Sequence, residues 1–138
     1  MDVEVKKDEE RAAQVLVVDD DDTLRAMTSL VLRRAGLRID QAKDGGEAIG
    51  RMQQSGYEVV VLDLMMPRIS GWDVIRWMTE HRSRRPRVLV VLTAASRTVL
   101  DELDPEIVNT ILFKPFDIHE LAAYVKACCQ GYATEAEA

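Results

Sequence analysis

The chain has 138 residues, which is enough for one domain with a substantial core and too few for two. Its net charge of −6 argues against a basic surface for nucleic acid or anionic membranes, and no apolar run approaches the ~18 residues that span a bilayer. The first residues are mostly charged and contain no hydrophobic signal region. We therefore expect a cytoplasmic domain at residues 14–130, with flexible tails at 1–13 and 131–138, no membrane insertion and no direct contact with nucleic acid.

Five segments have the composition of β-strands. Residues 15–18, 59–62 and 88–92 are continuous apolar runs, which are typical of strands buried on both faces of a parallel sheet. Two weaker strands are predicted at residues 38–42 and 110–113. Because polar residues follow several of these runs directly, the strand ends are the first places to look for a binding site.

Apolar residues at helical spacing predict helices between the strands. The first is predicted to be capped by Asp22 and to end at Gly36, and the second covers residues 46–54. A third helix carries its apolar face at residues 74–78, and the last helix covers residues 117–129. Strands and helices are thus expected to alternate five times along the chain.

This alternation predicts an α/β fold, a doubly wound five-stranded parallel sheet with helices on both faces. In the flavodoxin-like strand order 2-1-3-4-5, ligands bind at the switch point between the first and third strands. Those two strands end in Asp19 and Asp20 and in Asp63. We therefore expect the functional site at this edge of the sheet.

Two other features lie outside the strands. Residues 82–87 form a basic turn, which we interpret as a solvated loop rather than as a docking patch. Cys128 and Cys129 are adjacent, so a structural disulfide between them is not expected, and both are interpreted as reduced.

The carboxylates of Asp19, Asp20 and Asp63 are expected to crowd together at the sheet edge. Two unit charges ~4 Å apart repel by about 4 kcal/mol at an effective dielectric constant of about 20. Either the pKa values of these groups rise or a cation lies among them. Because the donors are all oxygens, without histidine or cysteine, the expected cation is Mg²⁺.

Thr93 and Lys114 end the fourth and fifth strands and are expected at the same edge. A carboxylate beside Mg²⁺, a hydroxyl and an ammonium is suited to receive a phosphoryl group, whose charge the metal and Lys114 would neutralise. Asp63 would be the nucleophile and Thr93 a hydrogen-bond donor. Ala94 is small and would leave the path to Asp63 open.

Four motifs, each at the end of a predicted strand, carry a resemblance to a known family. They are Val17-Val18-Asp19-Asp20, Leu62-Asp63-Leu64-Met65-Met66-Pro67 with Gly71, Leu92-Thr93-Ala94 and Lys114-Pro115-Phe116. Together they resemble the receiver domain of two-component response regulators, and in particular a stand-alone receiver of the chemotaxis type.

The resemblance implies how the site would work. Asp63 would be the phosphoacceptor, and Thr93 and Lys114 would be the pair that senses the phosphoryl group. The peptide bond between this lysine and the following proline is usually cis in the family, so a cis bond is expected at Lys114-Pro115.

The resemblance also implies metal ligands and partners. Asp20 and Asp63 would bind Mg²⁺ directly, the Met65 carbonyl would be a backbone ligand, and Asp19 would act through water. The phosphoryl donor would be a histidine kinase or a phosphotransfer protein, and a monomer or weak dimer would then contact an unidentified downstream protein. Beyond self-catalysed phosphorylation and dephosphorylation, no enzymatic activity is expected.

The chain departs from the family pattern in two places. Ile111 occupies a position where the family usually has an aromatic residue, so repacking of an aliphatic side chain is expected instead of a large rotamer switch. Residues 99–103 indicate a helix before the fifth strand, but Pro105 follows and the usual glycine-alanine pair is missing. This helix is therefore expected to be short or irregular.

Two alternative functions stay open. A receiver-like binding module that acts without phosphate is favoured by Ile111 and disfavoured by the complete set of acids, which is costly to keep without a cation. Residues 19–23 fit the Asp-x-Asp-x-Thr pattern of haloacid-dehalogenase-like phosphatases. Against that family, no acidic pair follows Lys114 to complete its metal site, and Asp63 would have no role.

Overall fold

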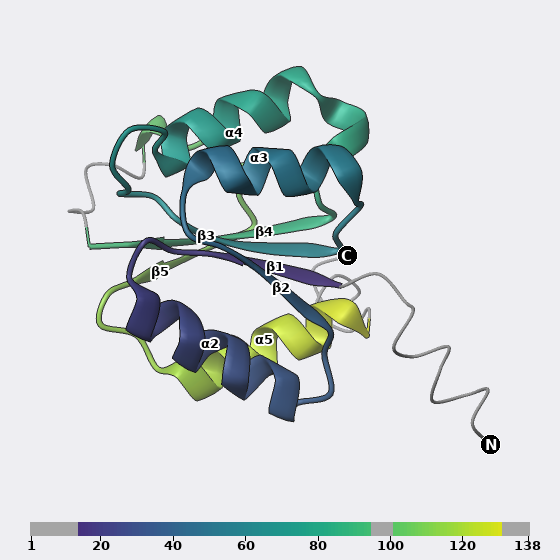
Figure 1. Ribbon diagram of the computed structural model, residues 1–138, viewed down its shortest axis with the longest axis vertical. Coiled ribbons are helices and arrows are strands. Elements are labelled where there is room, and N and C mark those ends of the chain that lie inside the picture. Colours follow the sequence, from purple (N-terminus) through teal and green to yellow (C-terminus); the bar gives the residue numbers. More distant parts are fainter. Residues whose placement is uncertain (1–13, 95–100, 131–138) are drawn as a thin grey trace.

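The computed structural model describes residues 14–94 and 101–130 (Figure 1). Its centre is a sheet of five parallel strands in the order β2-β1-β3-β4-β5, as predicted. The strands are β1 (Val15–Val18), β2 (Ile39–Ala42), β3 (Val59–Asp63), β4 (Val88–Thr93) and β5 (Thr110–Phe113). The predicted tails at 1–13 and 131–138, and the helical positions Val99 and Leu100, lie outside the described residues.

Helices cover both faces of the sheet in the described residues, which confirms the doubly wound arrangement. Helices α3 (Gly45–Gln54) and α4 (Gly71–Glu80) lie on one face, and α2 (Asp22–Arg34) and α5 (Ile118–Cys129) lie on the other (Figure 1). A short 3₁₀ helix, η1 (Arg82–Arg84), joins α4 to β4. None of the helices in the described part of the chain has the length and apolarity needed to cross a membrane.

The central strands β1, β3 and β4 are buried along their whole length. Successive side chains of a strand point to opposite faces, so each strand contributes to two hydrophobic clusters. Leu16 and Val18 belong to the cluster under α3 and α4, whereas Val15 and Val17 belong to the cluster under α2 and α5. The apolar runs are continuous because helices cover both faces.

The ends of the first two helices lie within one residue of their predicted positions. The Asp21 side chain accepts a hydrogen bond from the Leu24 N–H at 3.1 Å and caps α2. The predicted cap, Asp22, is wrong by one residue, because Asp22 is already the first helical residue. Gly36 follows α2 with a φ of 93° and ends it as predicted, and α3 begins at Gly45, one residue earlier than expected.

The connection from β4 to β5 contains no α-helix within its described part, residues 101–109. The helix predicted at residues 99–103, which was expected to be short or irregular, lies partly outside the described residues and stays a prediction. Asp104 O accepts hydrogen bonds from the Ile107 and Val108 N–H groups, both at 3.0 Å, which closes a turn around Pro105. Ile107 and Val108 are nevertheless buried in the cluster under α3 and α4, so this segment belongs to the core without being helical.

Candidate functional site

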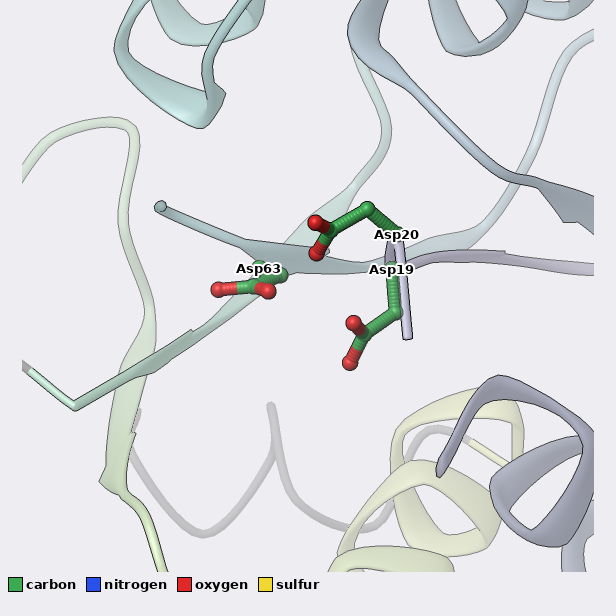
Figure 2. A group of neighbouring side chains, drawn as sticks. All are labelled: Asp19, Asp20 and Asp63. Carbon is green, nitrogen blue, oxygen red and sulfur yellow. The ribbon is translucent and has the colours of Figure 1, made fainter. Parts of the chain in front are cut away.

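Three carboxylates meet at the carboxyl edge of the sheet. Figure 2 shows Asp19 and Asp20 at the end of β1 and Asp63 at the end of the neighbouring β3, and one oxygen of each lies within 4.8 Å of the others. Asp19 and Asp63 are 1% and 3% exposed, whereas Asp20 faces solvent. The structure therefore brings together all three acids selected from the sequence.

Backbone hydrogen bonds orient the two buried carboxylates. Strands β1 and β3 pair in parallel, so Asp19 and Asp63 arrive at the same edge. The Asp21 N–H donates to Asp19 Oδ1 at 2.9 Å, and the Met65 N–H donates to Asp63 Oδ1 at 3.1 Å. In each case the chain two residues ahead binds one carboxylate oxygen and leaves the other, Oδ2, to the site.

Lys114 supplies positive charge to this site. Its Nζ lies 3.2 Å from Asp63 Oδ2 and 3.6 Å from Asp19 Oδ2. Its backbone N–H donates to Thr93 O at 2.8 Å, and its peptide bond to Pro115 is cis, as predicted. Burial alone would lower the pKa of Lys114, but the charges of Asp63 and Asp19 raise this pKa above its ordinary value. The ammonium therefore stays charged at neutral pH.

Burial raises the pKa of Asp63 to about 6. The Met65 N–H lowers this pKa, the charge of Asp19 raises it, and Lys114 lowers it again. Desolvation outweighs the two favourable partners because so little of the carboxylate reaches water. The metal-free site therefore holds a carboxylate that takes up a proton in mildly acidic solution, and a further cation would favour its charged form.

The donor set fits a hard divalent cation. Three carboxylates lie together and two of them pair with one ammonium, which leaves the site with excess negative charge. Asp19 Oδ2 is buried, accepts no hydrogen bond from the described residues and has only a long ion pair with Lys114 Nζ, at 3.6 Å, so this oxygen can take a further positive partner. The oxygen-only donors suit Mg²⁺. The cluster of Asp19, Asp20 and Asp63 could therefore hold this ion.

The other residues selected from the sequence lie at or near the carboxyl ends of β3, β4 and β5. Thr93 ends β4 and is 1% exposed, and Ala94 after it faces solvent. The Met65 side chain is exposed in the loop after β3. Ile111, on β5, is half-buried and pairs with Val91 of β4. Its side chain packs against the hydrophobic cluster under α3 and α4. Its aliphatic side chain is thus already in contact with the core.

Arg25 also belongs to the site and was not predicted from the sequence. Its Nη1 donates to Asp19 O at 2.7 Å, its Nη2 to Asp22 Oδ1 at 2.6 Å and its Nε to Gln41 Oε1 at 3.3 Å. One guanidinium thereby ties the loop that carries the acids to α2 and to β2. The spacing of three residues from Asp22 was the available signal, whereas the bonds to Asp19 and Gln41 depend on the tertiary fold.

A hollow of about 390 Å³ opens beside Asp20 and was also not predicted. The loops after β1, β2 and β3 border it, and its cationic side chains are Lys43 and Arg68. Arg68 has a φ of 65°, in the left-handed region that favours glycine. Backbone strain of this kind gathers in functional loops, and here it shapes the approach to the exposed acid.

The sheet is doubly wound, and its acidic cluster and lysine lie at the switch point, where sheets of this class bind ligands. The family model of the response regulator receiver domain matches residues 15–126. The chain therefore belongs to the family of response regulator receiver domains, which serve two-component systems.

Curated relatives are longer proteins. The probable transcriptional regulatory protein TcrX of Mycobacterium tuberculosis is 37% identical over 115 residues, which cover 82% of this chain and 48% of TcrX. The transcriptional regulatory protein ResD of Bacillus subtilis is 32% identical over 124 residues, which cover 87% of this chain and 49% of ResD. The chain spans about half the length of these relatives. The expected lack of contact with nucleic acid is therefore not supported, and the stand-alone organisation stays a prediction.

Two solved structures of receiver proteins share the fold over nearly their whole length. A CheY-like receiver domain protein from Methanospirillum hungatei JF-1 is 30% identical with a TM-score of 0.73, over 87% of this chain and 96% of that chain. The response regulator TrrA of Thermotoga maritima, solved in complex with Mg²⁺-BeF, is 30% identical with a TM-score of 0.72, over 85% of this chain and 99% of TrrA. Both likenesses agree with the family assignment.

Proposed function

We propose that this receiver domain accepts a phosphoryl group on Asp63 in a Mg²⁺-dependent reaction. The observation that carries the proposal is a buried carboxylate 3.2 Å from Lys114 Nζ and within 4.8 Å of two further carboxylates. The Mg²⁺-BeF complex of the related TrrA supports it. Asp20, Asp63 and the Met65 carbonyl are the proposed direct ligands of the ion, with Asp19 acting through water.

The proposed transfer divides the work among a few side chains. A carboxylate oxygen of Asp63 attacks phosphorus, a bond between oxygen and phosphorus forms, and the bond from phosphorus to the donor breaks with its electron pair leaving on the donor. Lys114 and Thr93 bind the phosphoryl oxygens. When bound, Mg²⁺ would neutralise charge on these oxygens. The small Ala94 leaves room for the donor to approach Asp63.

A histidine kinase or a phosphotransfer protein is the proposed donor. An apolar hollow of about 510 Å³ lies beside Lys114, and Leu24 and Phe116 are among its lining residues. On the same helix as Leu24, Met27 and Leu30 are 52% and 48% exposed. An exposed apolar surface next to a reactive group supports contact with a protein donor rather than with a small molecule alone.

The proposed output is a change in protein contacts, made either with a separate protein or with a further part of the same protein. The names and lengths of TcrX and ResD support the second form, in which transcription would be the process controlled. The described cysteines, Cys128 and Cys129, are free thiols, which supports the cytoplasm as the proposed location. The only chemistry proposed for the domain itself is self-catalysed phosphorylation and dephosphorylation.

Intact mass after incubation with Mg²⁺ and acetyl phosphate tests the phosphoacceptor. We expect one base-labile phosphoryl adduct on the natural chain and none on Asp63→Asn. Asp21→Asn is the matched control, because it makes the same chemical change in the neighbouring loop after β1 and asparagine also caps helices. An equal adduct on Asp63→Asn would overturn the proposal.

Ile111 supports a second candidate, a receiver-like module that signals without phosphate. Because its side chain already packs against the core, no aromatic residue has to move when a phosphoryl group arrives. Binding of beryllofluoride with Mg²⁺ distinguishes the two, since the phosphoacceptor proposal expects NMR shifts along β4 and β5 and the second candidate expects none. The phosphatase alternative is withdrawn, because the chain belongs to the receiver family.

A further inference from the structure

The arginine-rich turn between α4 and β4 has no part in the phosphoryl reaction. Residues 82–87 include four arginines in six positions. Arg87 donates hydrogen bonds to Glu58 Oε2, at 3.3 Å, and to Cys128 O. The side chains of the other three make no hydrogen bond or ion pair with the described residues. Unpaired arginines in a chain of net charge −6 form a local excess of positive charge.

Two of these unpaired arginines border a hollow of about 290 Å³. Arg82 and Arg85 share its wall with Asn109. Asn109 Oδ1 accepts a hydrogen bond from the Leu89 N–H at 2.8 Å, which orients the carboxamide and leaves its NH₂ group as a donor. The apolar part of the lining comes from Met78, Pro86, Leu89 and Ile107. The hollow therefore combines the nitrogen donors of Arg82, Arg85 and Asn109, besides the paired Arg87, with an apolar wall.

The hollow lies at the end of the sheet opposite the phosphoryl site. Strand β4 runs from Val88, next to the turn, to Thr93 at the site. Its six residues span about 20 Å when extended. The arginines therefore cannot reach a phosphoryl group on Asp63, and their charge has to serve a different ligand or none.

We propose that Arg82, Arg84, Arg85 and Asn109, named here the arginine corner, form a docking surface for an acidic segment of a partner protein. Guanidinium groups match carboxylates with paired, charge-assisted hydrogen bonds. The apolar wall takes an aliphatic side chain that lies between two acids of such a segment. Glu106 also lines the hollow, and its charge repels carboxylates, so the acids of the segment are expected to bind at the arginines.

A protein segment fits the arginine corner better than nucleic acid does. Binding to a duplex generally requires a longer basic stripe with roughly 6–10 phosphate contacts. The corner offers three unpaired arginines within one turn, in a chain that has 24 acidic and 18 basic residues. Part of the wall of its hollow is apolar, which suits a peptide rather than a phosphate backbone.

An NMR titration of the full, isotope-labelled chain with a peptide of alternating glutamate and leucine tests the proposal. We expect the amide signals of Arg85, Leu89 and Asn109 to shift together, and a peptide of glutamine and leucine to leave them in place. Binding is expected to weaken as salt is added, because exposed charges are screened.

Charge-removing variants give the second arm of the test. Arg82→Gln combined with Arg85→Gln is expected to weaken binding of the acidic peptide roughly tenfold or more, because two charge-assisted bonds are lost. Arg34→Gln combined with Arg76→Gln is the matched control, since it removes the same charge at exposed positions on α2 and α4. Adduct formation on Asp63 with acetyl phosphate is expected to continue unchanged in both double variants.

Three outcomes would overturn the proposal. The first is the absence of shifts around Asn109 at millimolar peptide. The second is an equal loss of peptide affinity in the two double variants, which would show that the peptide responds to the net charge of the protein and not to the arginine corner. The third is displacement of the peptide by inorganic phosphate or by a short DNA duplex at lower concentrations, which would assign the arginine corner to small anions or to nucleic acid.

Discussion

Asp63 is buried at the end of β3, and its pKa is raised to about 6 although the ammonium of Lys114 lies 3.2 Å away. A carboxyl group with a raised pKa destabilises the metal-free fold once it ionises. The same buried, crowded charge favours a cation and a phosphoryl group over an empty site. Asp63 therefore favours ligand binding at the cost of some stability of the metal-free fold.

Removing this charge is expected to stabilise the metal-free protein. Asp63 is protonated in both states below its unfolded pKa of about 4, and it ionises in the folded state only above about 6. Between these two pH values the folded state holds a proton that the unfolded state has lost. The free energy of unfolding of the natural chain therefore falls as the pH rises from about 4 to about 6. We expect the free energy of unfolding of Asp63→Asn to exceed that of the natural chain by roughly 1–3 kcal/mol at neutral pH. This difference is expected to vanish near pH ~4.

Urea unfolding in EDTA at several pH values measures this difference. Glu80→Gln makes a similar change at an exposed position at the end of α4 and is expected to show no such trend. A stability difference between Asp63→Asn and the natural chain that does not change with pH would contradict the argument.

Arg25 is expected to control Mg²⁺ affinity through the geometry of the loop after β1. Arg25→Lys keeps the positive charge but cannot reproduce the three hydrogen bonds to Asp19, Asp22 and Gln41. Because groups that orient metal ligands strongly affect affinity, we expect Mg²⁺ binding to weaken by up to roughly tenfold in calorimetric titration.

The control for this prediction lies on the same helix. Arg33 also donates to a backbone carbonyl, that of Ile39, at 3.3 Å, but it lies away from the acids. Arg33→Lys is therefore expected to leave Mg²⁺ affinity unchanged. If both variants bind Mg²⁺ like the natural chain, Arg25 does not position the site.

The residues that could be predicted from the sequence share one property. Asp63 and Thr93 end their strands and Lys114 directly follows one, and parallel strands deliver their ends to one edge. Arg25 and Lys43 escaped prediction because their positions depend on how loops and helices pack around that edge. Local sequence patterns predict the residues at strand ends well, but they predict contacts between separate loops poorly.

At the scale of elements, two glycines in helices have opposite surroundings. A Cβ on Gly71, the first residue of α4, would lie 2.5 Å from Asp63 O and from Leu64 Cα. A Cβ on Gly50, inside α3, would meet nothing within 4 Å. The start of α4 is therefore pressed against the end of β3, whereas the interior of α3 has room for a side chain.

This contrast predicts opposite effects of the same substitution. Gly50→Ala is expected to raise stability by about 0.5–1 kcal/mol, because alanine loses less backbone entropy in a helix. Gly71→Ala is expected to lower stability by roughly 1–3 kcal/mol and to slow phosphorylation, because α4 has to move away from the backbone of Asp63. Thermal unfolding and adduct formation measure both effects, and a Gly71→Ala protein as stable and as reactive as the natural chain would refute the close contact.

Element boundaries show where sequence patterns stop being sufficient. All five strands could be predicted, because apolar runs and their spacing define them. The cap of α2 was displaced from Asp21 to Asp22, because four consecutive acids are chemically equivalent until the backbone angles are known. The turn around Pro105 was expected to disturb a helix, but burial of Ile107 and Val108 without an α-helix follows only from packing against the sheet.

At the scale of the whole molecule, the sheet separates two charged surfaces. The acidic cluster lies at the carboxyl ends of the strands, and the arginine corner lies beyond the amino end of β4. The strand order was predictable, because alternation of strands and helices leaves few right-handed, doubly wound topologies. The arginine corner was interpreted from sequence as a solvated loop, since only the fold shows which of its charges lack partners.

Mg²⁺ is expected to stabilise the whole domain by mass action. An ion that binds only the folded state adds about 2.7 kcal/mol at ~100 times its dissociation constant. We expect thermal unfolding of the natural chain to shift upward with Mg²⁺, compared with sodium chloride at equal ionic strength, and the shift to be lost in Asp20→Asn. Because Asp20 faces solvent, this variant leaves the core intact, so the loss would assign the ion to the acidic cluster. An equal shift in Asp20→Asn would place the stabilising ion elsewhere and remove Asp20 from the proposed ligands.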